Sequence, residues 1–133
     1  MSQTFEDLKV YKLAMGLAVD IEKMTRALPG SELFRYTDQI LRSSRSIVAN
    51  IVEGYGRKFF KKDFIRFLTF ALASCDETQA HASMIYASGL MNNDLYRNLN
   101  KKCKDISVRL QNFINAIQIN DLKKSKSNLP NAI

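Results

Sequence analysis

The stretch that decides the fold is Ser46–Arg57, which reads SIVANIVEGYGR. Ile47 and Ile51 lie four residues apart, a spacing that places both on one face of a helix. Gly54 has no Cβ and tolerates a positive φ, so it suits the position just after a helix C-terminus. Gly56 then disfavours any continuation of the helix. The stretch therefore predicts the end of a helix, with Gly54 as the helix stop, followed by a basic connection.

Upstream of this stop, the predicted helix carries a row of polar side chains. They recur at steps of three and four residues and so share one helical face, which we call the polar seam: Gln39, Arg42, Ser46, Asn50 and Glu53. Apolar side chains flank the seam on two edges, and Ser43 and Ser44 fill a gap in one of them. The seam is either solvated or satisfied by a network between helices or subunits, because buried polar groups need partners. We favour a structural or interface role over ligand binding.

Apolar spacing predicts three further helices. The predicted helices span residues 5–28, 32–53, 61–89 and, after a cap at Asn93 or Asp94, about 93–120. The last helix is the clearest, because its apolar residues repeat as a heptad seam: Leu99, Cys103, Ile106, Leu110, Phe113 and Ile117. Glycine and proline are scarce, at five and two residues, which favours long helices over a turn-rich β fold. We expect an all-α, antiparallel up-down-up-down four-helix bundle.

We expect the chain to divide into a bundle over residues 1–120 and a mobile basic C-terminal tail over residues 121–133. The tail is rich in lysine, serine and asparagine and contains Pro130. The first helix carries two apolar stripes, which indicates two packing partners, the bundle core and a neighbouring copy of the chain. Gly16 lies inside this helix and is interpreted as a close helix contact.

Several runs resemble one known family. Gln39–Ile47 followed by Asn50–Arg57 resembles the four-helix-bundle proteins encoded in 23S rRNA intervening sequences. Phe5–Tyr11 is similar to the opening of that family, and Asp63–Leu68 and Ala71–Glu77 are similar to its third helix. The likeness extends to about residue 113, and its most specific part is the run from Ser46 to Gly54.

This resemblance implies an antiparallel four-helix bundle that assembles into a cyclic homo-oligomer, with a pentamer favoured. The family is similar to the accessory variability protein of diversity-generating retroelements. That likeness implies a link to RNA or DNA and to a reverse-transcriptase-like partner. Proteins of this kind have no established catalytic activity, so the resemblance implies more about fold than about function.

The chain is basic, with 20 lysines and arginines against 13 acidic residues and a formal net charge of +7. Two clusters concentrate this charge. The first basic cluster comprises Arg57, Lys58, Lys61, Lys62 and Arg66, and the second comprises Arg97, Lys101, Lys102 and Lys104. In an up-down bundle the first cluster shares one end with the tail, and the second lies away from both. These side chains are either ordinary solvated lysines and arginines or a nucleic-acid-binding surface that a ring repeats, so that weak phosphate contacts add.

Phenylalanines are frequent around the start of the third helix. Phe60, Phe64 and Phe67 keep a helical spacing and continue into an apolar stripe. We interpret this row as core, not as an aromatic platform for nucleic-acid bases, because base stacking requires exposed rings.

No pattern for catalysis or for a cofactor stands out. The single histidine, His81, follows Glu77 by four residues, whereas a di-iron bundle uses Glu-x-x-His on two helices. Cys75 and Cys103 lie far apart on apolar stripes and are interpreted as buried reduced thiols. We therefore expect no metal, no cofactor and no enzymatic activity. An enzyme that uses Arg42, Asn50 and Glu53 in a cleft remains a weaker alternative.

The N-terminus carries acidic residues before any apolar run, and the most apolar segment, Phe67–Cys75, is too short to cross a bilayer. We therefore expect a soluble cytoplasmic protein that does not enter a membrane. The leading hypothesis is a non-enzymatic oligomeric bundle that binds RNA, DNA or a nucleic-acid enzyme through its basic surface. The alternative is a structural or protein-interaction ring with no nucleic-acid partner.

Overall fold

The structure is a computed structural model that describes residues 3–28 and 34–127, with side chains as far as residue 124. A short 3-10 helix, η1 (Phe5–Asp7), precedes the four α-helices: α1 (Lys9–Ala27), α2 (Phe34–Gly56), α3 (Lys61–Ala87) and α4 (Asn93–Ser127). No β-strand occurs among the described residues. The predicted all-α class with four helices is therefore confirmed.

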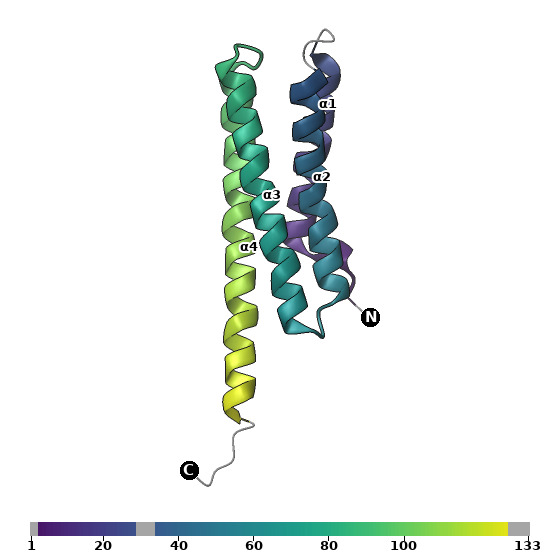
Figure 1. Cartoon of the computed structure of the whole chain (residues 1–133), viewed down its shortest axis with the longest axis vertical. Coiled ribbons are helices and arrows are strands. Elements are labelled where there is room, and N and C mark those ends of the chain that lie inside the picture. The colour runs from purple at the N-terminus through teal and green to yellow at the C-terminus, as the bar shows by residue number, and fades with distance from the viewer. Residues whose placement is uncertain (1–2, 29–33, 128–133) are drawn as a thin grey trace.

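The four helices lie side by side along one axis (Figure 1). The α2–α3 connection lies at the lower end in this view, and the α3–α4 connection lies at the upper end. Each helix packs against two others, in the order α1, α2, α3, α4 and back to α1, and within the described ranges the diagonal pairs make no close backbone approach. The packing of α1 against α4 is the sparsest of these interfaces. The lower part of α4 extends past the α2–α3 connection (Figure 1), and we call residues 118–127 the α4 overhang.

The core contains aliphatic side chains from all four helices. The largest fully buried ones are Leu17 and Ile21 on α1, Ile40, Ile47 and Ile51 on α2, Leu68 and Ile85 on α3, and Leu99, Ile106 and Leu110 on α4. Burying one such side chain contributes about 1.5–3 kcal/mol, so this interior supplies the main stabilisation. The heptad seam predicted for the last helix is confirmed, except that Phe113 lies at the core's edge, where Ile114 is buried instead.

Gly54 is not a helix stop. Helix α2 continues to Gly56, and Gly54 is buried inside it without a positive φ. A Cβ added at Gly54 would lie 3.2 Å from Cβ of Phe67 and 3.4 Å from the Phe64 carbonyl oxygen. The residue is therefore small because α3 approaches it closely, not because the backbone turns there. Among the described residues, the only glycine with a positive φ is Gly89, at 77°, in the α3–α4 connection.

Gly16 was interpreted as a close helix contact, and the structure contradicts this interpretation. A Cβ at this position would meet nothing within 4 Å, so Gly16 makes no close helix contact within the chain.

The cap of α4 was predicted one or two residues too late. The Leu95 N–H donates to Oδ1 of Asn92 at 2.8 Å. An N-cap side chain accepts from the third residue of its helix, so Asn92 is the cap.

The boundary predicted at residue 120 does not coincide with a helix end. Helix α4 continues to Ser127, so the first part of the segment assigned to a tail is helical. Residues 128–133 lie outside the described part of the chain, and the mobility of the tail stays a prediction. Across residues 3–28 and 34–127, no helix is both long enough and apolar enough to span a membrane.

Candidate nucleic-acid interface

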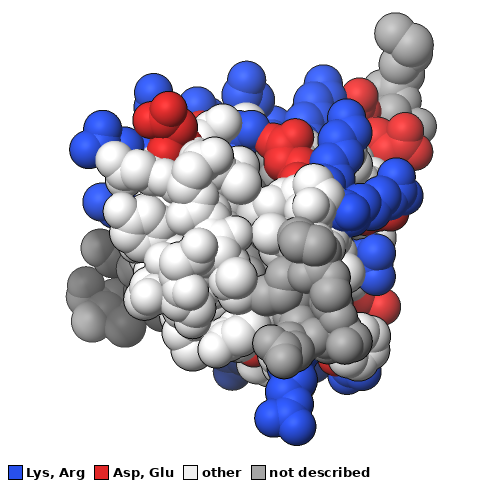
Figure 2. Space-filling model, turned by 90° about the horizontal axis from the view of Figure 1, so that it is seen from above, with Lys and Arg blue, Asp and Glu red and all other residues white. Residues whose placement is uncertain are grey.

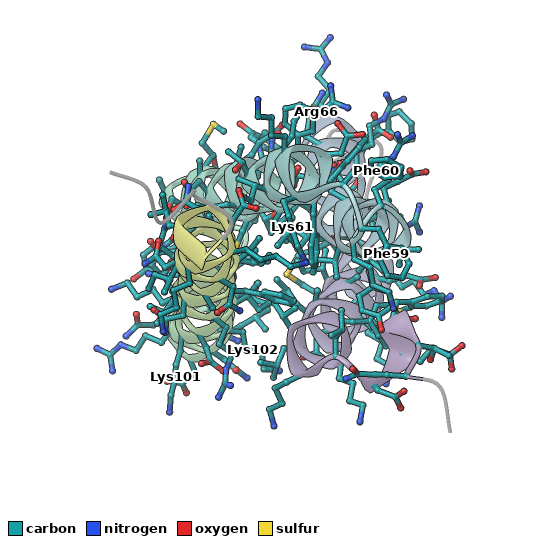
Figure 3. All side chains as sticks on the ribbon, turned by 90° about the horizontal axis from the view of Figure 1, so that it is seen from below. Phe59, Phe60, Lys61, Arg66, Lys101 and Lys102 are labelled. Atoms are coloured by element: carbon teal, nitrogen blue, oxygen red, sulfur yellow. The ribbon has the colours of Figure 1, made fainter. Side chains whose placement is uncertain are left out.

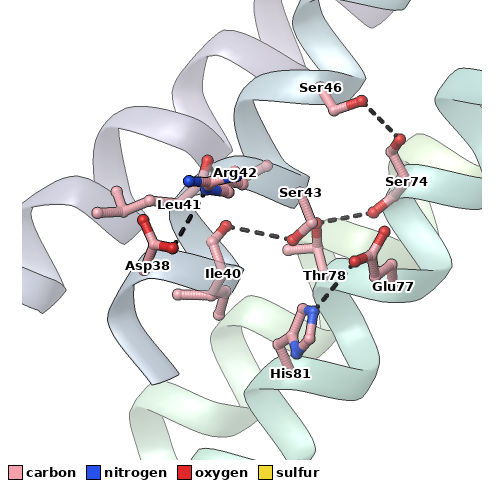
Figure 4. A network of polar contacts seen from close by, with 11 residues as sticks. Asp38, Ile40, Leu41, Arg42, Ser43, Ser46, Ser74, Glu77, Thr78 and His81 are labelled. Carbon is pink, nitrogen blue, oxygen red and sulfur yellow. Dashed lines mark hydrogen bonds and ion pairs between the residues drawn. The ribbon is translucent and has the colours of Figure 1, made fainter. Parts of the chain in front are cut away.

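A buried polar network joins α2 to α3 (Figure 4). The hydroxyls of Ser46 and Ser74 are 2.8 Å apart. One turn along α2, the Asn50 amide donates to Oγ of Ser46 at 3.0 Å and to its carbonyl oxygen at 2.9 Å. On the other side, the Thr78 hydroxyl lies 2.9 Å from Oγ of Ser43. No buried side-chain nitrogen or oxygen of the described residues lacks a partner, so the network is internally complete and serves to hold two helices together.

The polar seam is split by this arrangement. Ser46 and Asn50 belong to the network, whereas Gln39, Arg42 and Glu53 are exposed. Nε of Arg42 pairs with Asp38 at 3.1 Å along the outer surface, as Figure 4 shows. Glu53 lies 3.6 Å from Nε of Arg57. Arg42, Asn50 and Glu53 therefore make separate contacts along α2 and do not converge in a cleft.

The network also contains residues that sequence reasoning did not assign to it. Ser43 is buried, and its position within an apolar stripe of the sequence indicates a buried polar side chain. Ser74 and Thr78 are buried on α3 at a spacing of one helical turn. Small hydroxyl side chains within an apolar row are the available clue, but the sequence does not reveal which serine on α2 each one meets.

The two cysteines are buried, as predicted, and are unpaired. Sγ of Cys75 donates to the carbonyl oxygen of Cys103 at 3.2 Å. A side-chain hydrogen bond with Cys103, together with burial, raises the pKa of the Cys75 thiol well above its usual range. This thiol is therefore a core group and a poor nucleophile.

The first basic cluster lies at the α2–α3 connection, the lower end in Figure 1. Arg57 lies within 3.6 Å of both Glu53 and Asp63. Arg66 lies 3.4 Å from Asp63. These carboxylates partly neutralise the two arginines and fix their positions.

The lysines of the first cluster are arranged differently. Lys58 donates to the Tyr55 hydroxyl at 3.0 Å and sits 4.1 Å from the centre of that ring. Lys58, Lys61 and Lys62 form no ion pair with any described residue. Their positive charge is therefore available to an anion from outside the chain.

Aromatic rings lie beside Lys58, and the exposure of the phenylalanines at this connection corrects a sequence-based interpretation. Phe64 is buried, as expected, but Phe60 is 70% exposed and Phe59 is 83% exposed. Phe60 is the N-cap residue of α3 and has an extended backbone, so its side chain does not lie on the helical face that carries Phe64. Phe67 is partly buried, and the guanidinium groups of Arg57 and Arg66 lie 5.0 and 5.1 Å from its ring centre.

The second basic cluster lies on α4. Lys102 pairs with Asp20 of α1, and this contact links the two helices that pack most sparsely. Figure 3 shows Lys101 and Lys102 on the opposite side of the bundle from Phe59 and Phe60. The two clusters therefore do not merge into one surface. Seen from the upper end, lysines and arginines lie around the margins of the molecule, and the visible centre of this face is uncharged (Figure 2).

A groove follows the sparse seam between α1 and α4. Two hollows along it have volumes of about 400 and 260 Å³. The upper one is lined by Leu13 and Ile106 on its apolar side and by Lys12 at its edge, and Gly16 opens onto it. Asp20, Lys102 and Asp105 also line the upper hollow, and Asp20 and Lys102 pair with each other.

The comparisons with known proteins agree with this fold. Residues 6–112 match the family described as 23S rRNA-intervening sequence protein. A crystal structure of a protein with unknown function from the S23 ribosomal protein family of Bacteroides thetaiotaomicron is similar, with 28% identity and a TM-score of 0.74 over 80% of this chain and 95% of that chain. A search of curated proteins finds no match. Because the family match covers most of its length, the chain belongs to the 23S rRNA-intervening sequence protein family.

Proposed function

We propose that this chain is a non-enzymatic, oligomeric helical-bundle protein that binds nucleic acid through the first basic cluster. The observation that carries the proposal is the set of lysines at the α2–α3 connection, Lys58, Lys61 and Lys62, which have no acidic partner among the described residues. The net charge of +7 supports it, because a basic protein attracts polyanions over a distance. The family's description, which names an rRNA segment, supports the same class of partner.

We further propose that the four helices form an antiparallel up-down-up-down bundle. Because the affinity of one chain for phosphates would be modest, we also propose that the bundle assembles into a cyclic homo-oligomer, with five copies favoured. Apolar side chains on α1 that the chain itself leaves uncovered, Met15 and Val19, support this assembly. They line a hollow of about 250 Å³ between α1 and α2. Repetition of the first basic cluster around a ring would raise the overall affinity through multivalency.

A salt titration tests the proposal. Fluorescence anisotropy of labelled RNA and DNA oligonucleotides is measured at several salt concentrations, with light scattering of the same samples. Each phosphate contact contributes a slope of about −0.7 to −0.9 in log affinity against log salt. We expect binding that weakens steeply with salt, by a particle larger than one chain. Affinity that does not depend on salt, or no binding at low salt, would refute the nucleic-acid partner.

The alternative is a structural or protein-interaction ring without nucleic acid. The exposed apolar side chains on α1 and α4, such as Val19 and Val108, favour this reading because they require a protein surface and no polyanion. An assembled particle that fails to bind any oligonucleotide would support it. Such a particle binding a protein that itself handles nucleic acid would place the chain as an adaptor.

A further inference from the structure

We propose that Phe59 and Phe60 form a platform on which unpaired bases stack, so that the ligand of the α2–α3 connection is single-stranded nucleic acid. This inference rests on the proposed nucleic-acid-binding function and narrows it to a strand with accessible bases. Sequence reasoning assigned Phe60 to the core, and the exposure of the two rings reverses that assignment.

The chain exposes two phenylalanine rings at an energetic cost. Phe59 and Phe60 are consecutive, 83% and 70% exposed, and lie at one tight connection. Covering an exposed ring removes apolar surface from water, and the isolated chain forgoes this stabilisation at two consecutive residues. Neither ring packs against another aromatic ring among the described residues. Most of the surface of both rings is therefore open to a partner.

Positively charged lysines lie next to the two rings in the chain. Nζ of Lys58 lies 5.6 Å from the centre of the Phe59 ring. Lys61 and Lys62 follow Phe60 directly, and all three lysines lack ion pairs with described residues. Aromatic rings flanked by unpaired cations offer stacking for a base and a counter-charge for the phosphate beside it, the combination found in proteins that bind single strands.

The nearby Phe67 ring differs from Phe59 and Phe60 because it already has cationic partners. Asp63 holds Arg57 and Arg66 close to the Phe67 ring, so that ring is already covered by two guanidinium groups. Figure 3 shows Phe59 and Phe60 at the outer side of the connection, with Arg66 projecting beyond the bundle. The arginines are thus fixed by an acid inside the chain, while the two exposed rings and the lysines remain for a ligand.

Two partners could cover this surface, a nucleic acid or a second copy of the chain, and the charges favour the nucleic acid. A self-interface at this surface needs an acidic patch opposite the lysines. About half of the described acids already pair with a lysine or arginine of their own chain, as in Asp20 with Lys102, Glu22 with Arg26 and Asp38 with Arg42. A polyanion with flat apolar rings satisfies both the lysines and the phenylalanines. A duplex offers only its phosphates, because its bases are already stacked.

The experiment compares two variants by anisotropy with single-stranded and duplex oligonucleotides of one sequence, each as RNA and as DNA. The test variant is Phe59→Ala/Phe60→Ala. The matched control is Phe34→Ala, which removes an equally exposed ring (68%) at the start of α2. We expect the test variant to bind the single strand about tenfold more weakly or worse, with an unchanged salt slope, and to bind the duplex as before. The control should bind like the unmodified chain. The RNA and DNA arms identify which strand is preferred.

A second measurement reports on stacking directly. The chain contains no tryptophan, so Phe59→Trp introduces a single reporter. We expect its fluorescence to fall when the single strand binds and to stay constant with the duplex. Binding without any change in tryptophan emission would contradict stacking at this position.

The outcomes separate this inference from the proposed function. If the unmodified chain binds no oligonucleotide, both fail. If it binds single strand and duplex equally and the test variant matches it, the platform is wrong and the basic cluster alone explains binding. If light scattering shows that the test variant loses its oligomeric state while the control keeps it, the rings are subunit contacts and the platform is overturned.

Discussion

Replacing Gly54 by alanine tests whether close packing of α2 on α3 explains this glycine. In an exposed helix the change would stabilise the chain by about 0.8–1 kcal/mol, because alanine restricts the unfolded backbone and favours helix. At Gly54 the new Cβ would lie 3.2 Å from Cβ of Phe67 and 3.4 Å from the carbonyl oxygen of Phe64. Neither atom can rotate away, because both are fixed to the α3 backbone.

The two helices must therefore separate slightly along their most extensive interface. Overpacking of this kind costs about 1–3 kcal/mol, which exceeds the gain in helix propensity. We expect Gly54→Ala to lower the free energy of unfolding by about 1 kcal/mol, or the melting temperature by about 4 °C. The size is similar to that expected for a positive-φ stop, but the cause differs.

The assay is thermal and urea denaturation followed by far-ultraviolet circular dichroism, at equal protein concentration because assembly adds to stability. Gly16→Ala is the matched control. Its Cβ would meet nothing within 4 Å, so it should stabilise the chain by about 0.5–1 kcal/mol. The packing argument is wrong if Gly54→Ala is as stable as the unmodified chain, or if both alanines shift the transition in the same direction.

Three further outcomes are expected. Thr78→Val should lower the free energy of unfolding by about 1 kcal/mol, because it removes the hydroxyl next to Ser43, and urea denaturation measures it. Cys75 should resist thiol reagents in the native protein and react on unfolding, because its burial and raised pKa keep it protonated; rapid labelling of the folded chain would contradict this. Lys61→Gln/Lys62→Gln should reduce the slope of log affinity against log salt by about 1.4 for a single strand, as titrations at four or more salt concentrations will show. An unchanged slope would place the phosphates elsewhere.

The helices themselves could be predicted because their apolar residues recur with helical spacing. The heptad of α4 identified its buried face almost residue by residue, since near-parallel packing repeats every seven residues. Gly54 was misread because two different demands select glycine, a positive φ and a close neighbour, and only the position of Phe67 distinguishes them. Sequence spacing carries no information about the distance to another helix.

The candidate site was predicted only in part. The charges of the first basic cluster were evident from the sequence. The availability of Lys61 and Lys62 could not be foreseen, because it depends on Asp63 turning towards the two arginines. Phe60 fits the spacing of the core stripe, yet it is the N-cap residue of α3 and points away from that stripe. One residue at a helix boundary thus decided whether a ring is core or surface.

The α4 overhang has a consequence for monitoring assembly. A length of helix that buries little apolar surface is marginal in water, because most helical stability in proteins comes from tertiary packing. Its backbone amides should therefore exchange with deuterium quickly in an isolated chain and become protected once another molecule lies against Ile119 and Leu122, both exposed in the bundle. Mass spectrometry of peptides from this segment would then record the arrival of a partner, whether a sister copy or another macromolecule, without any label.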